Sequence, residues 1–190
     1  MDKFKRKSHI NLYSPGIVVF DPLVLNAFLI EKDYIGNNIF EYFINNEDVG
    51  QESIKNGIIL PLYPIVEHDY YIHIESEKNH PKLIEDFFYS GFPLTVKSDL
   101  LITADLNALF DWDPNFFLHY RANYHSKLEN NDYLDVKPGI YSANIRGGRS
   151  DSKNETTYIY KIELIESYEL PLLASETTIE SFNFNLIHEN

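Results

Sequence analysis

The chain has 190 residues, of which 44% are hydrophobic and 15% aromatic, and its formal net charge at pH 7 is −13. A chain of this length and apolar content buries a real core, so intrinsic disorder is excluded. The excess of carboxylates argues against nucleic acid and membrane surfaces as direct ligands, because both are anionic, and it favours a basic protein partner.

The chain contains no cysteine. Disulfides, cysteine metal sites and a thiol nucleophile are therefore excluded, and a cytoplasmic location is favoured. There is no glycine-rich phosphate loop, no Gly-x-Ser-x-Gly elbow and no kinase signature, so we expect no cofactor, and the sequence favours a protein that is not an enzyme.

Basic residues dominate the start of the chain, at Lys3, Lys5, Arg6 and Lys7. We expect residues 1–9 to form a disordered basic terminus and residues 10–190 to form a single globular domain. Prolines, a glycine and an aspartate interrupt the apolar residues between positions 10 and 30, which argues against a signal peptide and a membrane span there.

The first half of the domain alternates between strand and helix patterns. A strand is predicted over 17–20, and Asp21-Pro22 resembles a helix N-cap followed by proline at the first helical position. The following segment, 23–31, fits a buried helix and a buried strand almost equally well. One or two short helices are expected over 37–55, an irregular or edge strand over 58–66, and a strand over 69–75.

In the second half, a proline start and an apolar stripe predict a helix over 82–89. Strands are predicted over 92–96 and 100–103, short helices over 105–110 and 114–124, a polar linker over 126–135, and a last strand near 182–186. The clearest signal is a β-hairpin over 136–166, in which Tyr141, Ala143 and Ile145 alternate with polar residues before a bend and a second alternating run. These elements predict an α+β fold: antiparallel, sandwich-like sheets with several short helices.

Three carboxylates and the single tryptophan cluster at Asp105, Asp111, Trp112 and Asp113. A carboxylate pair can supply the acid and the base for glycoside hydrolysis, and a tryptophan can stack on a sugar ring. The alternative is that Asp105 and Asp113 cap short helices. These three aspartates are the candidate catalytic residues.

Asp69, His73 and Glu75 share one face of a predicted strand and are the candidate metal ligands. They lack the helical His pair or the calcium-loop pattern that usually accompanies such sites, so a solvated strand face is the alternative.

The candidate binding residues are mostly aromatic or cationic: Tyr71, Glu75, Trp112, Arg146 and Arg149. The two arginines belong to Arg146-Gly-Gly-Arg149, which we interpret as the hairpin bend, with glycines at positive φ and arginines that pair with carboxylates or contact a partner. A single copy on an acidic body does not indicate RNA binding.

The segments Gly16-Ile-Val-Val-Phe-Asp-Pro22 and Pro138-Gly-Ile-Tyr141 resemble those of small, uncharacterised bacterial β-rich proteins, including immunity proteins that neutralise toxins. The resemblance covers about 11 residues and implies no catalytic residue. It favours an acidic protein-binding module, and the resemblance implies an immunity-type protein that neutralises a basic partner. The alternatives are a hydrolase or carbohydrate-binding protein built on the Asp105 cluster, and a structural or oligomerisation module. The sequence leaves the oligomeric state open.

Overall fold

The computed structural model describes residues 4–74, 83–152, 155–173 and 181–188. Within these ranges the chain forms nine strands, six α-helices and one 3-10 turn. The strands are β1 (Lys7–Asn11), β2 (Ile17–Phe20), β3 (Ile59–Leu62), β4 (Asp69–Ile74), β5 (Ile84–Val96), β6 (Leu100–Asp105), β7 (Asn131–Asp135), β8 (Gly139–Ser152) and β9 (Glu155–Ser167). The helices are α1 (Pro22–Glu31), α2 (Ile39–Asn45), α3 (Glu47–Lys55), α4 (Asn107–Phe110), α5 (Pro114–Leu118) and α6 (Tyr120–Asn123), with the 3-10 turn η1 (Tyr124–Ser126).

The strands form two sheets. The five-stranded sheet has the order β1-β4-β9-β8-β5, and the four-stranded sheet has the order β3-β2-β6-β7. Every pair of neighbours is antiparallel except β4 and β9. The predicted α+β fold, rich in antiparallel strands and short helices, is confirmed.

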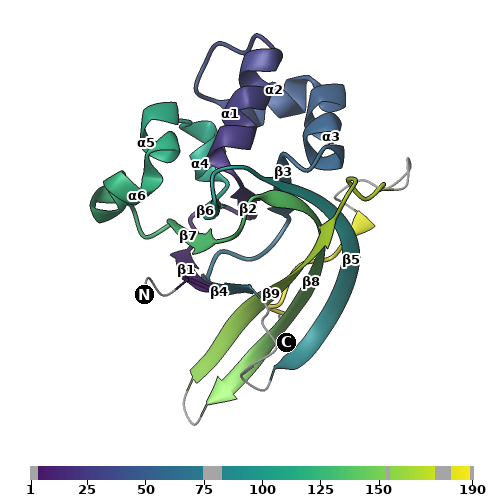
Figure 1. Ribbon diagram of the computed structural model, residues 1–190. Helices are drawn as coiled ribbons and strands as arrows, with labels where there is room; N and C mark the ends of the chain where they lie inside the picture. Colours follow the sequence, from purple (N-terminus) through teal and green to yellow (C-terminus); the bar gives the residue numbers. More distant parts are fainter. Residues whose placement is uncertain (1–3, 75–82, 153–154, 174–180, 189–190) are drawn as a thin grey trace.

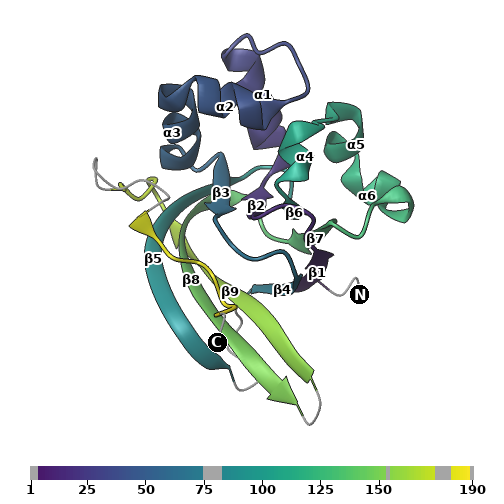
Figure 2. The ribbon, with the colours of Figure 1, turned by 180° about the vertical axis from the view of Figure 1, so that it is seen from behind.

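The molecule has three layers, with the helices on one face of the four-stranded sheet and the five-stranded sheet on its other face (Figures 1 and 2). One core lies between the sheets, where Val19 and Leu101 meet Tyr70, Tyr160 and their neighbours. A second core lies beneath the helices around Phe20, Phe28 and Phe117. Three strands of the four-stranded sheet, β2, β3 and β6, are buried on both faces, which explains their mostly apolar sequences.

Segment 23–31, for which the sequence allowed either a helix or a strand, belongs to helix α1. The Asp21 carboxylate accepts hydrogen bonds from the N–H groups of Leu23 and Val24, and Pro22 occupies the first turn. The predicted cap is therefore confirmed, and it favours the helix over the strand. No helix in the described part of the chain is long and apolar enough to cross a membrane.

The predicted helix over 82–89 is wrong, because residues 84–89 form the first half of β5. Two bulges, between Glu85 and Phe87 and between Tyr89 and Phe92, interrupt the pairing of β5 with β8. Each bulge shifts the alternation of side chains. The apolar residues of β5 therefore lose the two-residue period of a strand and imitate the spacing of a helix.

The predicted polar linker over 126–135 is also wrong, because it contains the last residue of η1 and all of strand β7. Asn131, Asp132 and Asp135 are polar but buried, and each accepts a hydrogen bond from a side chain elsewhere in the fold. A strand whose polar groups are satisfied internally has no apolar pattern, so hydropathy could not reveal it.

Arg146 to Arg149 do not form the hairpin bend, because they lie inside β8 and pair with β5 and β9. A side chain at Gly147 would meet the ring of Phe87 at 2.3 Å, and one at Gly148 would meet the carbonyl oxygen of Ile84 at 2.2 Å. The glycines therefore allow β5 to approach closely and do not supply the expected positive φ.

The two ends of the described chain differ from the expectations in opposite ways. Strand β1 begins at Lys7, inside the segment expected to be disordered, and Lys5 contacts β7. The segment near 182–186 is not a strand, although Phe184 and Leu186 are buried in the core between the sheets. It packs through its side chains without joining a sheet.

Candidate functional site

Residues of α2, α3, α4 and the edge strand β3 line a groove. Helices α2 and α3 lie in the upper part of the molecule in Figures 1 and 2. The volume of the groove is about 390 Å³, and its lining is mostly apolar. The lining residues are Phe40, Phe43, Ile44, Glu47, Gly50, Gln51, Ile54, Ile59, Pro61, Tyr63, Leu106 and Leu109.

The local sequence explains the shape of this groove. Helix α2 buries Ile39 and Phe43 against the core and leaves Ile44 59% exposed at the groove. Helix α3 follows after a single residue and carries Gly50 where it passes α2. A Cβ atom at Gly50 would lie 3.0 Å from the carbonyl oxygen of Phe43, so glycine lets the two helices approach closely.

The helices around the groove are acidic. Segment 31–56 contains six carboxylates and two lysines. Lys32 is paired with Glu52 at 2.7 Å, which removes one of those lysines as a free charge. Glu41, Glu47 and Asp48 are exposed on α2 and α3. Their charges create a negative potential beside an apolar surface.

The three candidate catalytic aspartates do not form a shared acid and base site. Asp105 is fully buried and accepts hydrogen bonds from the Ser14 hydroxyl and from the N–H groups of Ser14 and Asn107. Asp113 caps α5 by accepting from the N–H groups of Asn115 and Phe116. Asp111 is exposed after α4. Asp113 thus matches the capping alternative, whereas Asp105 precedes the N-cap residue of α4, Leu106, and has no exposed surface.

Trp112 is only 5% exposed and stacks on Phe117 at a centroid distance of 5.1 Å. A buried ring cannot offer its face to a sugar, so this residue belongs to the core beneath the helices.

The candidate metal ligands are separated by their environments. Asp69 lies near the His9 imidazole at 3.7 Å, whereas His73 is 9% exposed within β4. Glu75 lies outside the described residues. Across the described ranges, no group of three or more His, Asp or Glu side chains is placed to hold a metal ion.

Of the candidate binding residues, Tyr71 and Arg146 lie on the five-stranded sheet. Tyr71 is 36% exposed and stacks on His9 with centroids 4.4 Å apart. Arg146 pairs with Glu85 at 3.0 Å, and Arg149 lies 4.0 Å from Asp86. Both arginines thus pair with carboxylates, as one of the two predicted roles requires.

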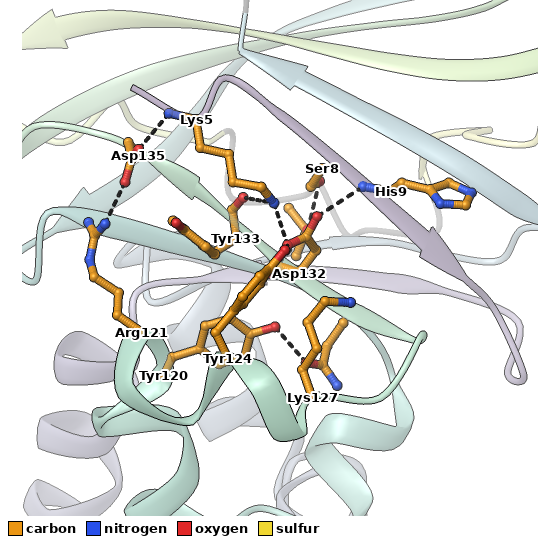
Figure 3. A network of polar contacts seen from close by, with 12 residues as sticks. Lys5, Ser8, His9, Tyr120, Arg121, Tyr124, Lys127, Asp132, Tyr133 and Asp135 are labelled. Atoms are coloured by element: carbon orange, nitrogen blue, oxygen red, sulfur yellow. Dashed lines mark hydrogen bonds and ion pairs between the residues drawn. The ribbon is translucent and has the colours of Figure 1, made fainter. Parts of the chain in front are cut away.

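A polar network joins the start of the chain to β7 (Figure 3). The carboxylate of Asp132 accepts hydrogen bonds from the Lys5 ammonium, the Tyr124 hydroxyl and the His9 N–H. Burial lowers the pKa of Lys5, although its pairing with Asp132 opposes this change. Burial, with the nearby Asp132 charge, raises the pKa of Tyr124 to about 12. The network holds the N-terminal segment on the fold.

Asp135 extends this network. It accepts from the Lys5 N–H and from the Arg121 guanidinium, which also pairs with Asp99 at 2.8 Å. Because these charges are paired with one another, the network has a structural role and offers little free charge to a ligand.

Sequence reasoning missed the groove. The helical spacing of α2 was recognisable, but the exposure of Ile44 depends on β3 and α4, which are distant in sequence. The density of carboxylates over 31–56 was the available signal.

No protein-family model matches this chain, and no curated protein matches it. Among solved structures, the fold is similar to ComJ from Bacillus subtilis, an inhibitor of the DNA-degrading activity of NucA. The two share 11% sequence identity with a TM-score of 0.44, over 88% of this chain and 99% of ComJ.

Proposed function

We propose that this chain is a protein-binding module whose groove between α2, α3 and β3 docks a basic protein. The observation that carries the proposal is an apolar groove of about 390 Å³ flanked by exposed carboxylates on the two helices that wall it. Apolar pockets hold the anchor residues that dominate binding energy, and complementary charge speeds and orients association.

Ile44 is the proposed anchor point. It is 59% exposed, and the groove places it beside Phe40, which is half-buried. A partner side chain that enters the groove would remove both from water, which is favourable by roughly 25 cal/mol per Å² of apolar surface. Glu47 lines the same groove and would face a lysine or arginine beside that anchor.

The groove favours a partner that inserts side chains over a partner that adds a strand to the edge of the sheet. β3 is an edge strand, but Pro61 lies within it and has no N–H to donate. A proline at a sheet edge hinders pairing with another chain. The partner therefore docks through an apolar anchor and neighbouring basic residues.

Beyond binding, we propose that the chain neutralises its partner, as immunity proteins do. Enzymes that act on DNA need basic surfaces to attract the phosphate backbone. An acidic module that covers such a surface blocks the substrate, so nucleases are the class of partner that this charge pattern fits. The proposal depends on the groove and its charge, and not on the distant likeness to ComJ.

The test uses purified nucleases with basic surfaces, including NucA, and acidic hydrolases of similar size as controls. Calorimetry measures affinity at low and high salt, and a DNA-degradation assay measures inhibition. We expect binding to a basic nuclease that weakens as salt rises. Ile44→Asp should weaken it at least tenfold, because it places a charge in the apolar groove. Glu47→Lys should mainly slow association.

Two matched variants control for nonspecific effects. Ile165→Asp changes another isoleucine of similar exposure, 48%, on β9, and Glu129→Lys reverses an exposed charge outside the groove. Both should bind like the parent protein. Equal weakening by Ile44→Asp and Ile165→Asp, or the same affinity for acidic and basic enzymes, would contradict the proposal.

A further inference from the structure

The exposed face of helix α1 is apolar. Leu23, Ala27 and Ile30 follow one another at spacings of four and three residues, so they form one stripe along the helix. Leu23 is 46% exposed, Ile30 is 67% exposed, and Ala27 between them is also exposed. The opposite face, which carries Leu25 and Phe28, is buried in the core beneath the helices. Helix α1 is therefore apolar on both sides, whereas a surface helix is normally polar on the side that faces water.

Helix formation does not explain this stripe. Among the ten residues of α1, only Asn26 and Glu31 are polar. Lysine, glutamate and glutamine form helices as well as leucine does and better than isoleucine, so they would serve an exposed position at least as well as Ile30. Apolar side chains that are contiguous on the surface mark interaction sites. The stripe therefore points to a contact with another molecule.

The stripe is complementary to a second copy of itself. Two α1 helices that pack antiparallel about a two-fold axis bring Leu23 of one copy beside Ile30 of the other. Ala27 then lies close to the axis, where its small side chain lets the two helices approach. A two-fold contact uses the same patch on both copies. A stripe with large side chains at its ends and a small one between them meets that requirement.

The charges at the two ends of α1 fit the same arrangement. Glu31 is exposed at the C-terminal end. Lys97 is exposed at the N-terminal end, where its backbone N–H donates to the Asp21 carboxylate at 2.6 Å. Neither side chain forms an ion pair within the part of the chain that the structure describes. An antiparallel pair places each Glu31 near Lys97 of the other copy, and such exposed pairs set orientation more than affinity.

We propose that the stripe formed by Leu23, Ala27 and Ile30 is the contact between two copies of this chain in a weak two-fold dimer. Helix α1 lies in the helical layer, with the four-stranded sheet between it and the five-stranded sheet (Figure 1). No residue of the stripe lines the groove of the proposed function, so the dimer does not rest on that function. One short helix per copy provides less than the roughly 1,200–2,000 Å² of a stable complex, so the dimer forms only as concentration rises.

Single cysteines test the geometry directly, because the chain has none of its own. Ala27→Cys places two thiols close to the two-fold axis, and we expect a disulfide-linked dimer on mild oxidation. Leu23→Cys and Ile30→Cys should each stay largely monomeric alone, whereas their equal mixture should give the mixed dimer. Ile165→Cys, at an isoleucine of 48% exposure on β9, is the control and should not cross-link. Cross-linking of Leu23→Cys to itself as readily as Ala27→Cys, or no mixed dimer, would overturn the antiparallel contact.

Sedimentation equilibrium measures the dimer without a cross-link. Association of the parent chain should strengthen as salt rises, because each copy carries a formal charge of −13 and salt screens their repulsion. Ile30→Asp should weaken association at least tenfold, and Ile165→Asp should leave it unchanged. Equal effects of these two variants, or a parent chain that stays monomeric up to millimolar concentration, would overturn the proposal. Binding of a basic partner in the groove weakens with salt, so the two contacts can fail independently.

A charge exchange tests the predicted pairing of Glu31 with Lys97. Glu31→Lys lowers the net negative charge and Lys97→Glu raises it, yet each should weaken the dimer by removing the pairing. The double variant restores opposite charges at the parent net charge, so it should recover most of the parent association. Stronger association of Glu31→Lys than of the parent chain, or no recovery in the double variant, would exclude the pairing and with it the antiparallel orientation.

Discussion

The carboxylate of Asp21 accepts hydrogen bonds from the backbone N–H of Ser98 at 2.6 Å and from its hydroxyl at 2.8 Å. The same carboxylate accepts from the N–H groups of Lys97, Leu23 and Val24. Asp21 is fully buried. One side chain therefore caps α1 and also fixes the turn between β5 and β6, which connects the helical layer to both sheets.

Replacing this carboxylate should be strongly destabilising. In Asp21→Ala, four backbone N–H groups in buried or part-buried hydrogen bonds lose their acceptor, and we expect a loss of about 3 kcal/mol in the free energy of unfolding. Ser98→Ala removes a single hydroxyl donor and should cost only about 1 kcal/mol. Urea denaturation of both variants measures the difference. Similar losses for the two would show that Asp21 acts only as a partner of the Ser98 hydroxyl.

The contrast between local and distant partners explains how far the sequence predicts this fold. The cap that Asp21 forms on α1 was predictable, because it involves residues two and three positions away. Its bonds to Ser98 span 77 positions and were not. Asp105 follows the same rule, since its bond to Asn107 is local and its bonds to Ser14 span 91 positions. Hydrogen bonds between residues close in sequence could be predicted from the sequence, whereas hydrogen bonds to partners distant in sequence could not.

The same limit applies to the strands and to the groove. The strongest alternating runs, in β4, β8 and β9, were predicted because one face of each packs on the core between the sheets. Bulges concealed the first half of β5, although its second half was predicted as a strand over 92–96, and internal polar partners concealed β7. The groove forms only where α2, α3, β3 and α4 meet, and no local sequence pattern predicts that these elements meet.

Two glycines of the paired strands β5 and β8, Gly91 and Gly148, should differ in how much stability is lost when each is replaced by alanine. Gly148→Ala places a methyl group 2.2 Å from the Ile84 carbonyl oxygen, a backbone atom that cannot rotate away. We expect a loss of about 3 kcal/mol or more, because β5 must move. Gly91 has a φ of +86° but open space around it, so Gly91→Ala should cost only about 1 kcal/mol. Urea denaturation ranks the two, and the reverse order would contradict the close approach of β5.

The pairing of Lys5 with Asp132 should be measurable by a double-mutant cycle. Lys5→Met leaves the largely buried Asp132 carboxylate without its cation, and we expect a loss of about 2 kcal/mol. Asp132→Asn in the same chain should recover part of that loss, because the uncompensated charge is removed. Lys7→Met, at an exposed lysine of β1, is the control and should change stability by less than about 0.5 kcal/mol. Additive losses in the double variant would exclude a direct coupling.

Alkaline pH should weaken the same region through Tyr124. Burial and Asp132 raise the pKa of Tyr124 from 10.0 to about 12 in the folded chain. A folded-state pKa above the unfolded one means that the folded state holds the proton more tightly, so the stabilisation is complete below pH 10 and is lost as pH rises towards 12. Burial also raises the pKa of Tyr70, Tyr120 and Tyr160, which act in the same direction.

The measurement is the free energy of unfolding in urea at a series of pH values from neutral to alkaline. The parent chain should lose stability above pH 10, and Tyr124→Phe should lose it less steeply, because phenylalanine has no proton to release. The lowered pKa of Lys5 acts in the opposite direction, since its ammonium is disfavoured in the folded state. Tyr124→Phe should therefore be compared with its parent in the Lys5→Met background as well. If Tyr124→Phe leaves the slope of the free energy of unfolding against pH unchanged in both backgrounds, this tyrosine is not a source of the alkaline sensitivity.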